Sequence, residues 1–135
     1  MIGNNCVDIF HSEDDFNKID KDTVIEIIND IYELLKPGGL FRWSLSDYKT
    51  DILKSRVVYH SDGNIHYDPG SGSRMSEDNL VIGGAIWFPT IEMVKKMIKQ
   101  TKFSESNVNY IQYYDEEGNG VLGNIDYSNG YISRT

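Results

Sequence analysis

Histidine side chains are the groups in this sequence best suited to acid–base chemistry near neutral pH. The 135 residues contain three of them, at positions 11, 60 and 66. Because an imidazole changes its charge between about pH 5 and 8, it can take a proton from a substrate hydroxyl or amine and later return it. We take His11 and His66 as the two candidate general bases.

His11 ends a short apolar run at residues 6–11 that we expect to be a buried strand. Ser12 and Glu13 follow it directly. In open α/β sheets, ligands bind at the carboxyl ends of the strands, so we expect His11, Ser12 and Glu13 to contact a ligand or cofactor. In the structural alternative, Ser12 caps the turn that follows, and His11 is a satisfied histidine at a strand end.

Residues 55–80 are a second concentration of polar and aromatic side chains. The segment has turn signals at 62–63 and 69–73, so we expect a long irregular loop, which in a compact domain is either functional or disordered. Its side chains could line a substrate pocket, with Tyr59, His60 and Asp68 as candidate substrate contacts. Its histidines and aspartates lack helical or finger-like spacing, so we predict no metal site.

The elements that would hold these groups centre on a helix followed by a strand. Apolar residues recur at spacings of three and four within residues 23–36, which predicts an amphipathic helix with the stripe Val24, Ile27, Ile28, Ile31, Leu34 and Leu35. We expect a capping box of Thr23 and Glu26 to begin this helix, with Asp20 or Asp22 as alternative caps. Pro37 and a following glycine should end it.

Residues 40–45 carry large apolar side chains on both alternating faces, which predicts a strand covered on both sides. The helix and this strand are typical of half of a β–α–β crossover. A short helix is expected at 47–54, capped by Ser46 or Asp47. A further helix should follow Thr90, with the apolar stripe Ile91, Val94, Met97 and Ile98.

The end of the chain is rich in strand-forming residues. Residues 108–114 and 121–125 predict an antiparallel hairpin around a turn at 116–120, and residues 131–133 could add further strand. Trp87 lies just before the helix that follows Thr90. We consider it either a core residue or the wall of a substrate pocket.

Composition excludes several classes of protein. Thirteen Lys and Arg against 21 Asp and Glu give a net charge of −8, which disfavours nucleic acid as a partner. No run approaches the roughly 18 apolar residues of a membrane span, and the first six residues do not have the pattern of a signal peptide. The single Cys6 excludes an intrachain disulfide. We therefore expect one cytoplasmic domain over residues 1–135, with no nucleic-acid or membrane partner.

Residues 31–44, Ile-Tyr-Glu-Leu-Leu-Lys-Pro-Gly-Gly-Leu-Phe-Arg-Trp-Ser, resemble the helix, Leu-Lys-Pro-Gly-Gly turn and fifth strand of class I methyltransferases that use S-adenosylmethionine (SAM). Residues 7–12 resemble the family's fourth strand, and residues 87–90 resemble its later segment, in the same order along the chain. The resemblance implies an α/β fold with part of a mixed, Rossmann-like methyltransferase sheet and a C-terminal antiparallel hairpin. It also implies SAM as the cofactor and methyl transfer to an oxygen, nitrogen or carbon nucleophile.

The family's glycine-rich SAM-binding loop precedes the matched region and has no counterpart in residues 1–5. We therefore expect a fragment, a truncated form or one part of a split methyltransferase that acts on a small molecule such as a sugar. Whether the chain is an enzyme by itself stays open. The alternatives are a non-catalytic methyltransferase-fold module that binds or oligomerises, and an unrelated small α/β enzyme that uses residues 59–68. Because missing strands would leave an edge and an apolar flank uncovered, the two methyltransferase hypotheses predict a partner chain or a homo-oligomer.

Overall fold

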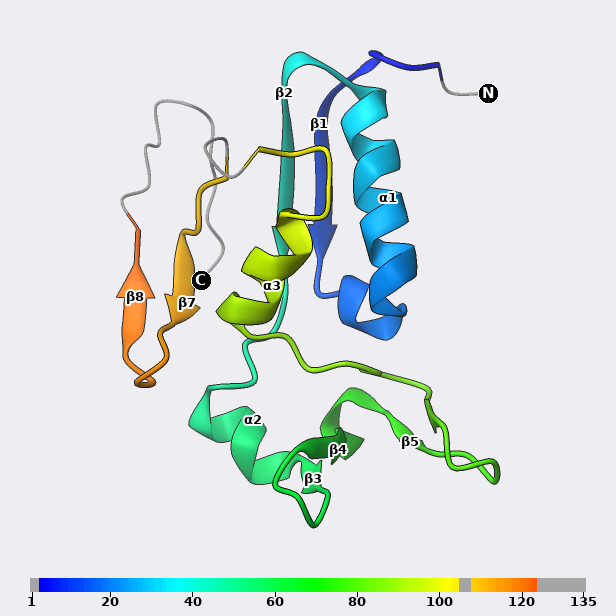
Figure 1. The fold of residues 1–135 in the computed structure, drawn as a ribbon, viewed down its shortest axis with the longest axis vertical. Coiled ribbons are helices and arrows are strands. Elements are labelled where there is room, and N and C mark those ends of the chain that lie inside the picture. The colour runs from blue at the N-terminus through cyan, green and yellow to red at the C-terminus, as the bar shows by residue number, and fades with distance from the viewer. Residues whose placement is uncertain (1–2, 105–107, 124–135) are drawn as a thin grey trace.

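Two parallel strands and two helices form the larger part of the fold (Figure 1). The computed structural model describes residues 3–104 and 108–123. In it, β1 (Val7–Glu13) pairs in parallel with β2 (Leu35–Ser44), and the chain between them forms a 3-10 turn, η1 (Phe16–Lys18), and the helix α1 (Lys21–Leu34). Parallel strands need a long crossover, and the helix predicted from the sequence supplies it.

The helix predicted over residues 23–36 is present as α1, but it begins and ends two residues earlier, and a different residue caps it. The Asp20 carboxylate accepts hydrogen bonds from the Thr23 hydroxyl (2.6 Å) and from the Thr23 backbone N–H (3.0 Å). These bonds lower the pKa of the Asp20 carboxyl. Thr23 is therefore inside the helix, the predicted capping box with Glu26 is wrong, and the alternative cap Asp20 is confirmed.

α1 ends at Leu34, before Pro37, so the prediction that Pro37 and a following glycine end the helix is wrong; Pro37, Gly38 and Gly39 lie in the first part of β2. Gly38 has φ +79°, a conformation that costs a residue with a Cβ roughly 1–2 kcal/mol. At Gly39 a larger residue is excluded by close contacts, because a Cβ there would lie 2.9 Å from the carbonyl oxygen of Lys36 and 3.2 Å from that of Asp8. The two glycines near the start of β2 are thus required for separate reasons.

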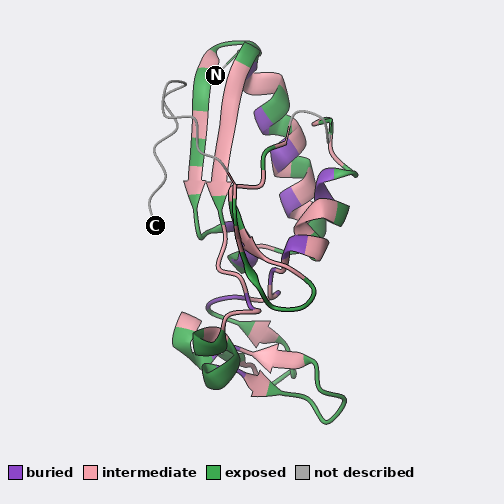
Figure 2. Ribbon diagram, turned by 90° about the vertical axis from the view of Figure 1, so that its left-hand side faces the viewer, coloured by how far each residue is buried: buried purple, intermediate pink, exposed green. Residues whose placement is uncertain are grey.

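The main core lies between the β1–β2 pair and the helices. Its most deeply buried helical members come from α1 and from α3 (Ile91–Ile98), namely Val24, Ile28, Ile31, Met97 and Ile98. Aromatic side chains fill the strand side: Phe41 stacks on Trp43 with 5.6 Å between ring centroids, and Phe16 contacts both rings. Figure 2 shows both helices, with their buried residues, on one side of the strands.

No described helix covers the other face of the β1–β2 pair. Because Phe41 and Trp43 pack into the core, strand alternation places Leu40 and Arg42 on the opposite face, together with their partners Ile9 and His11. Ile9 is 62% exposed. The predictions that residues 6–11 are buried and that residues 40–45 are covered on both sides are therefore wrong for the described part of the chain.

Residues 50–82 form short regular elements in place of the irregular loop expected over 55–80. These are α2 (Asp51–Arg56), β3 (Val58–Tyr59), β4 (Ile65–Tyr67), the 3-10 turn η2 (Pro69–Ser71), β5 (Arg74–Met75) and β6 (Val81–Ile82). β3 pairs with β4 and β5 pairs with β6, both antiparallel. The helix predicted at 47–54 begins late, at Asp51, with Thr50 as its cap. Tyr48, Val57 and Ala85 form a second, smaller core.

The elements of the C-terminal part are those predicted from the sequence. Thr90 caps α3, and β7 (Gln112–Tyr114) pairs antiparallel with β8 (Gly120–Leu122). The mixed α/β class and the C-terminal hairpin are confirmed. The described strands form separate pairs, so the continuous Rossmann-like sheet is not observed among them. The strand predicted at 131–133 lies outside the described residues.

No helix in ranges 3–104 and 108–123 has both the length and the apolar character to span a bilayer.

Replacing Ile28 with alanine tests the packing of α1. Ile28 is fully buried, so the substitution should leave a cavity and lower the free energy of unfolding by roughly 2–5 kcal/mol. Ile52→Ala is the control, because Ile52 on α2 is 77% exposed and its loss should cost less than about 0.5 kcal/mol. Urea unfolding followed by tryptophan fluorescence measures both. Equal costs would contradict the packing of the α1 stripe.

Candidate functional site

Polar side chains gather at the adjacent carboxyl ends of β1 and β2. In the strand register His11 is opposite Arg42, and Glu13 is opposite Ser44. His11 Nε2 lies 3.2 Å from Glu13 Oε1, and both side chains are nearly half exposed. Ser12 alternates to the other face, where Trp43 is its partner. The three predicted ligand contacts of β1 therefore stand at the strand end, but His11 and Glu13 face away from Ser12.

Asp14 connects the ends of β1 and β2 through hydrogen bonds. Its backbone has φ +52°, an uncommon conformation that Asp tolerates better than most residues. Its Oδ1 accepts hydrogen bonds from the Ser46 N–H (3.1 Å) and the Ser46 hydroxyl (2.9 Å), and its own N–H donates to the Ser44 carbonyl oxygen (2.9 Å). The chain that leaves β2 is thus fixed against the chain that leaves β1.

Asp47 and Lys49 connect this end of the strands to α3 and the hairpin. Asp47 Oδ2 accepts from the Tyr114 N–H (2.9 Å), while Lys49 Nζ donates to Glu92 Oε1 (2.6 Å) and to the Asp115 carbonyl oxygen (2.9 Å). The Lys49 side chain is only 19% exposed. Burial by itself raises the pKa of Glu92, but the hydrogen bond from Lys49 and smaller contributions outweigh it, and the pKa is lowered. The Glu92 carboxyl is therefore ionised at neutral pH.

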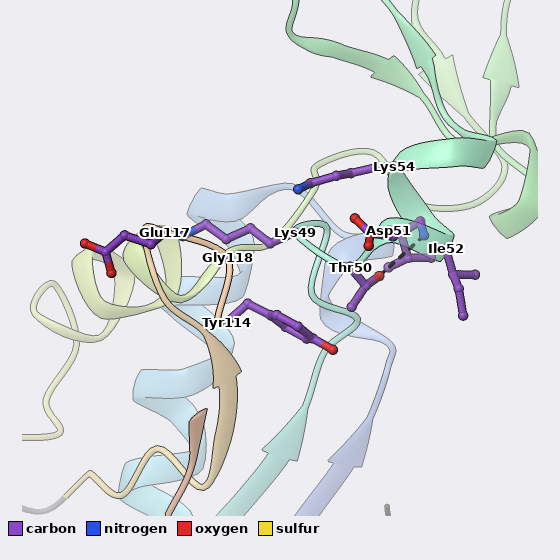
Figure 3. Close-up of a pocket in the computed structure, with 9 residues that line it drawn as sticks. Lys49, Thr50, Asp51, Ile52, Lys54, Tyr114, Glu117 and Gly118 are labelled. Atoms are coloured by element: carbon purple, nitrogen blue, oxygen red, sulfur yellow. Dashed lines mark hydrogen bonds between the residues drawn. The ribbon is translucent and has the colours of Figure 1, made fainter. Parts of the chain in front are cut away.

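A pocket of about 580 Å³ opens beside this junction (Figure 3). It lies between the start of α2 and the hairpin turn, and it is lined by Lys49, Thr50, Asp51, Ile52, Leu53, Lys54, Tyr114, Glu117 and Gly118. Figure 3 shows the carboxyl ends of β1 and β2 running toward these residues. The volume suits a small ligand.

The pocket has no strong preference for either sign of charge. Lys49 and Lys54 are balanced by Asp51 and Glu117, so the lining gives little electrostatic attraction to an anion or a cation. The Tyr114 hydroxyl, the Lys54 ammonium and the carboxylates can each donate or accept hydrogen bonds. This arrangement suits a neutral molecule with several hydroxyl groups.

The sequence-based prediction missed all of these pocket residues. The rule that selected His11 and Glu13, proximity to the carboxyl end of a parallel strand, also selects Thr50 and its neighbours after β2. That signal was present in the sequence. The contribution of Tyr114 had no such signal, because the hairpin reaches the pocket only through tertiary contacts.

The candidate residues His60, His66 and Tyr59 lie together on the β3–β4 ribbon. The two imidazole rings stack with 3.8 Å between centroids and an interplanar angle of 19°. The Tyr59 hydroxyl donates to the Lys54 carbonyl oxygen at 3.0 Å, which connects the ribbon to α2. His66 therefore contacts His60, whereas His11 pairs with Glu13 on β1, and the structure does not join the two candidate bases in one cluster.

Asp68 is fully buried at the centre of a hydrogen-bond network. Its carboxylate accepts from the Tyr48 hydroxyl (2.6 Å), from Arg56 Nη2 (2.7 Å) and from the Gly70 N–H (2.9 Å). Burial alone raises the pKa of Asp68, but the hydrogen bonds from Arg56 and Tyr48 reverse this and lower it. Burial, together with the Asp68 carboxylate, raises the pKa of the Tyr48 hydroxyl. Asp68 thus holds α2, η2 and the second core together and offers no exposed surface to a substrate.

Trp87 was expected to be either a core residue or the wall of a substrate pocket, and it is a core residue. Its side chain is buried in the main core at 6% exposure. The indole Nε1 donates to the carbonyl oxygens of Phe16 (3.0 Å) and Ile19 (2.8 Å). These bonds connect the segment before α3 to the chain around η1.

The described residues do not by themselves fit SAM. His11, Ser12 and Glu13 line neither the pocket of Figure 3 nor the larger groove beside β2. The segments from β1 into α1 and from β2 into α2 contain no glycine, so neither can supply the close-approaching backbone of a glycine-rich loop. Among the residues that the structure describes, no group of three or more His, Cys, Asp or Glu side chains is placed to bind a metal ion.

A scan of protein-family models, a search of curated proteins and a search of solved structures each found no match to the chain.

Replacing Asp68 with asparagine tests its structural role through the pH dependence of stability. Because the folded state lowers the pKa of Asp68 below its ordinary value of 3.8, the carboxylate stabilises the fold above about pH 4, and the effect is lost as pH falls through the folded pKa. Asp68→Asn should lower the free energy of unfolding by about 3 kcal/mol at pH 7. The difference from the natural protein should shrink below pH 4.

Asp62→Asn is the matched control, because Asp62 is an exposed aspartate between β3 and β4 whose carboxylate accepts hydrogen bonds from its near neighbour Asn64. Its effect at pH 7 should be much smaller than that of Asp68→Asn. Urea unfolding at several pH values measures all three proteins. A difference between Asp68→Asn and the natural protein that stays constant down to pH 2 would contradict the role of the ionised carboxylate.

Proposed function

We propose that this chain is the acceptor-binding part of a SAM-dependent methyltransferase, and that the acceptor is a small neutral molecule rich in hydroxyl groups, such as a sugar. The observation that carries the proposal is the position of the pocket, at the carboxyl end of a parallel β–α–β unit. Ligands of α/β proteins bind at this end. The order of β1, α1, β2, α3 and the antiparallel hairpin supports the proposal, because it is the order that the sequence resemblance implies.

The lining of the pocket supports a polyhydroxylated acceptor. Thr50 and Asp51 present oxygen atoms at the start of α2, and Lys54 adds a donor one turn later. Tyr114 and the exposed Ile52 add apolar surface on which the C–H face of a sugar ring can pack. A mixture of hydrogen-bonding groups and apolar surface without net charge matches the chemistry of a sugar.

His11 is the first candidate for the general base; since it does not line the pocket of Figure 3, the reacting group of the acceptor would have to extend beyond the pocket to the end of β1. Glu13, 3.2 Å away, can orient the imidazole and stabilise its protonated form. The exposed position of His11 leaves it accessible to a bound molecule. His66 on β4 is the second candidate, and substitution distinguishes the two.

SAM supplies the methyl group in reactions of this class. We place most of its binding site on a glycine-rich segment outside these 135 residues, in a partner chain or in a longer form of the protein. His11, Ser12 and Glu13 would contact the cofactor from this side. The chain alone should therefore bind SAM weakly, and we propose that the complete enzyme acts in the cytoplasm.

Titration with SAM tests the methyltransferase part of the proposal. At about 10 mM SAM, the backbone amide signals of residues 11–13 should shift in NMR spectra, with a Kd no tighter than about 1 mM. His11→Ala should weaken these shifts without changing the circular dichroism spectrum, whereas the control His60→Ala should not. No response of residues 11–13 would contradict the proposal, and micromolar binding by the chain alone would contradict the need for a second segment.

Titration with methyl α-D-glucoside tests the acceptor. The amide signals of Thr50, Asp51 and Tyr114 should shift, and Tyr114→Ala should weaken binding at least about fivefold, because the tyrosine supplies ring contact. Tyr59→Ala is the control, since Tyr59 is 46% exposed on β3 and does not line the pocket. Equal effects of the two substitutions, or stronger binding of inorganic phosphate than of the sugar, would contradict a neutral polyol as the ligand.

The open face of the β1–β2 pair favours a second candidate function, a non-catalytic module that oligomerises. Ile9 and Leu40 are partners on this face, Ile9 is 62% exposed, and no described helix covers the face. An apolar pair beside a free strand edge is a typical contact between protein chains. Light scattering on the samples used for the SAM titration separates the two functions. A stable dimer that does not respond to SAM would favour the module.

A further inference from the structure

The β3–β4 ribbon carries two histidines whose rings lie against each other. Figure 1 shows the two strands side by side near α2. His60 directly follows β3, and His66 lies within β4. Their rings stack with 3.8 Å between centroids and an interplanar angle of 19°. His60 is exposed and His66 is half-buried, so a ligand from solvent can reach the pair.

The backbone of the ribbon holds the two histidines opposite each other. The His60 N–H donates to the Asn64 carbonyl oxygen (2.8 Å), and the Gly63 N–H donates to the His60 carbonyl oxygen (3.0 Å). On the other strand, the Tyr67 ring contacts the His66 ring edge-on, with 5.4 Å between centroids. The fold of the ribbon therefore brings the two imidazoles together before any ligand binds, which lowers the entropy cost of binding to both.

The chemistry of the pair favours a transition metal ion as the ligand. Two neutral imidazoles offer two nitrogen ligands and no negative charge, which suits Zn²⁺, Cu²⁺ and Ni²⁺. Mg²⁺ and Ca²⁺ require several oxygen ligands instead. The acid in the turn, Asp62, already accepts hydrogen bonds from the Asn64 N–H (2.9 Å) and from Asn64 Nδ2 (3.2 Å). The pair is therefore a site for a metal that prefers nitrogen.

The separation of the rings fits two ligands of one ion. A bond from Zn²⁺ to an imidazole nitrogen is about 2.0–2.1 Å long, so two nitrogens on one ion lie about 2.9–3.4 Å apart for bond angles of about 90–110°. The ring centroids are 3.8 Å apart. A small tilt of each ring brings one nitrogen of each into this range and turns both toward a common point. Rotation about the second side-chain torsion, which is broad for histidine, supplies that tilt.

We propose that His60 and His66 bind one divalent transition metal ion, and that water or a further ligand occupies its other coordination positions. In the part of the chain that the structure describes, no third His, Cys, Asp or Glu completes a cluster with them. Structural zinc sites have four protein ligands, whereas sites with open positions exchange water for other ligands. The proposed site is of the open kind.

The proposal differs from the sequence-based expectation of no metal site. That expectation relied on the spacing of ligands along a helix or a finger, whereas His60 and His66 meet across an antiparallel ribbon of very short strands. The inference does not depend on the methyltransferase proposal.

Calorimetric titration with Zn²⁺ at pH 7.5, where an ordinary imidazole is neutral, tests the inference. One ion should bind per chain. His60→Phe and His66→Phe should each weaken binding at least about tenfold, since even a partner of a metal ligand contributes that much affinity. Phenylalanine keeps a ring that can stack but has no nitrogen ligand. Cu²⁺ should bind more tightly than Zn²⁺. Unchanged affinity in either variant, equal binding of Mg²⁺, or one ion per two chains would overturn the inference.

Asp62→Asn is the matched control on the same turn. Asparagine keeps an oxygen that can accept from Asn64, so Zn²⁺ affinity should stay within about twofold of the natural protein if the histidines are the ligands. In NMR spectra of the natural protein, Zn²⁺ should shift the ring signals of His60 and His66 together and leave those of His11 in place. A loss of affinity in Asp62→Asn equal to that in the histidine variants, or a shift of His11 instead of the pair, would overturn the inference.

Discussion

Parallel strands cannot be joined by a tight turn, and this constraint determines where α1 lies. The chain that leaves β1 must return to the start of β2, and a helix over one face of the pair covers that distance. α1 then brings Val24, Ile28 and Ile31 onto the face that carries Phe41 and Trp43. α3 packs beside α1 on the same face, so the carboxyl ends of both strands are left free for polar contacts.

Carboxylates and one lysine organise that free end. The Asp14 carboxylate accepts a hydrogen bond from the Ser46 hydroxyl, and the Asp47 carboxylate accepts one from the Tyr114 N–H. The Lys49 ammonium donates to Glu92 on α3 and to the Asp115 carbonyl oxygen of the hairpin. A charge pair that is partly withdrawn from water gains attraction but loses hydration, so its net contribution to stability is small. Its effect on geometry is larger, because the Lys49 ammonium satisfies groups from α3 and the hairpin at the same time. The position of the pocket wall therefore follows from directed contacts more than from burial.

Sequence patterns predicted the parts of this fold that have long periodic signals. α1, α3 and the β7–β8 hairpin were predictable because apolar spacing, Thr90 and the turn at 116–120 each specify local structure. The ribbons between residues 58 and 82 were not, since strands of two or three residues are too short to show a period. The role of Asp68 could not be predicted from the sequence either. Its burial depends on Tyr48 and Arg56, and an aspartate in a polar segment has no sequence feature that separates a structural role from substrate binding.

The hairpin that forms one wall of the pocket is held by contacts of modest energy. Besides the bonds at its turn, Lys95 Nζ lies 5.3 Å from the ring centroid of Tyr110 and 5.4 Å from that of Tyr113. Cation–π contacts near the surface contribute about 0.5–1 kcal/mol each, and exposed ion pairs no more. Burial of one large apolar side chain contributes roughly 1.5–3 kcal/mol. The polar contacts of the hairpin together therefore contribute about as much as the burial of one such side chain in the main core.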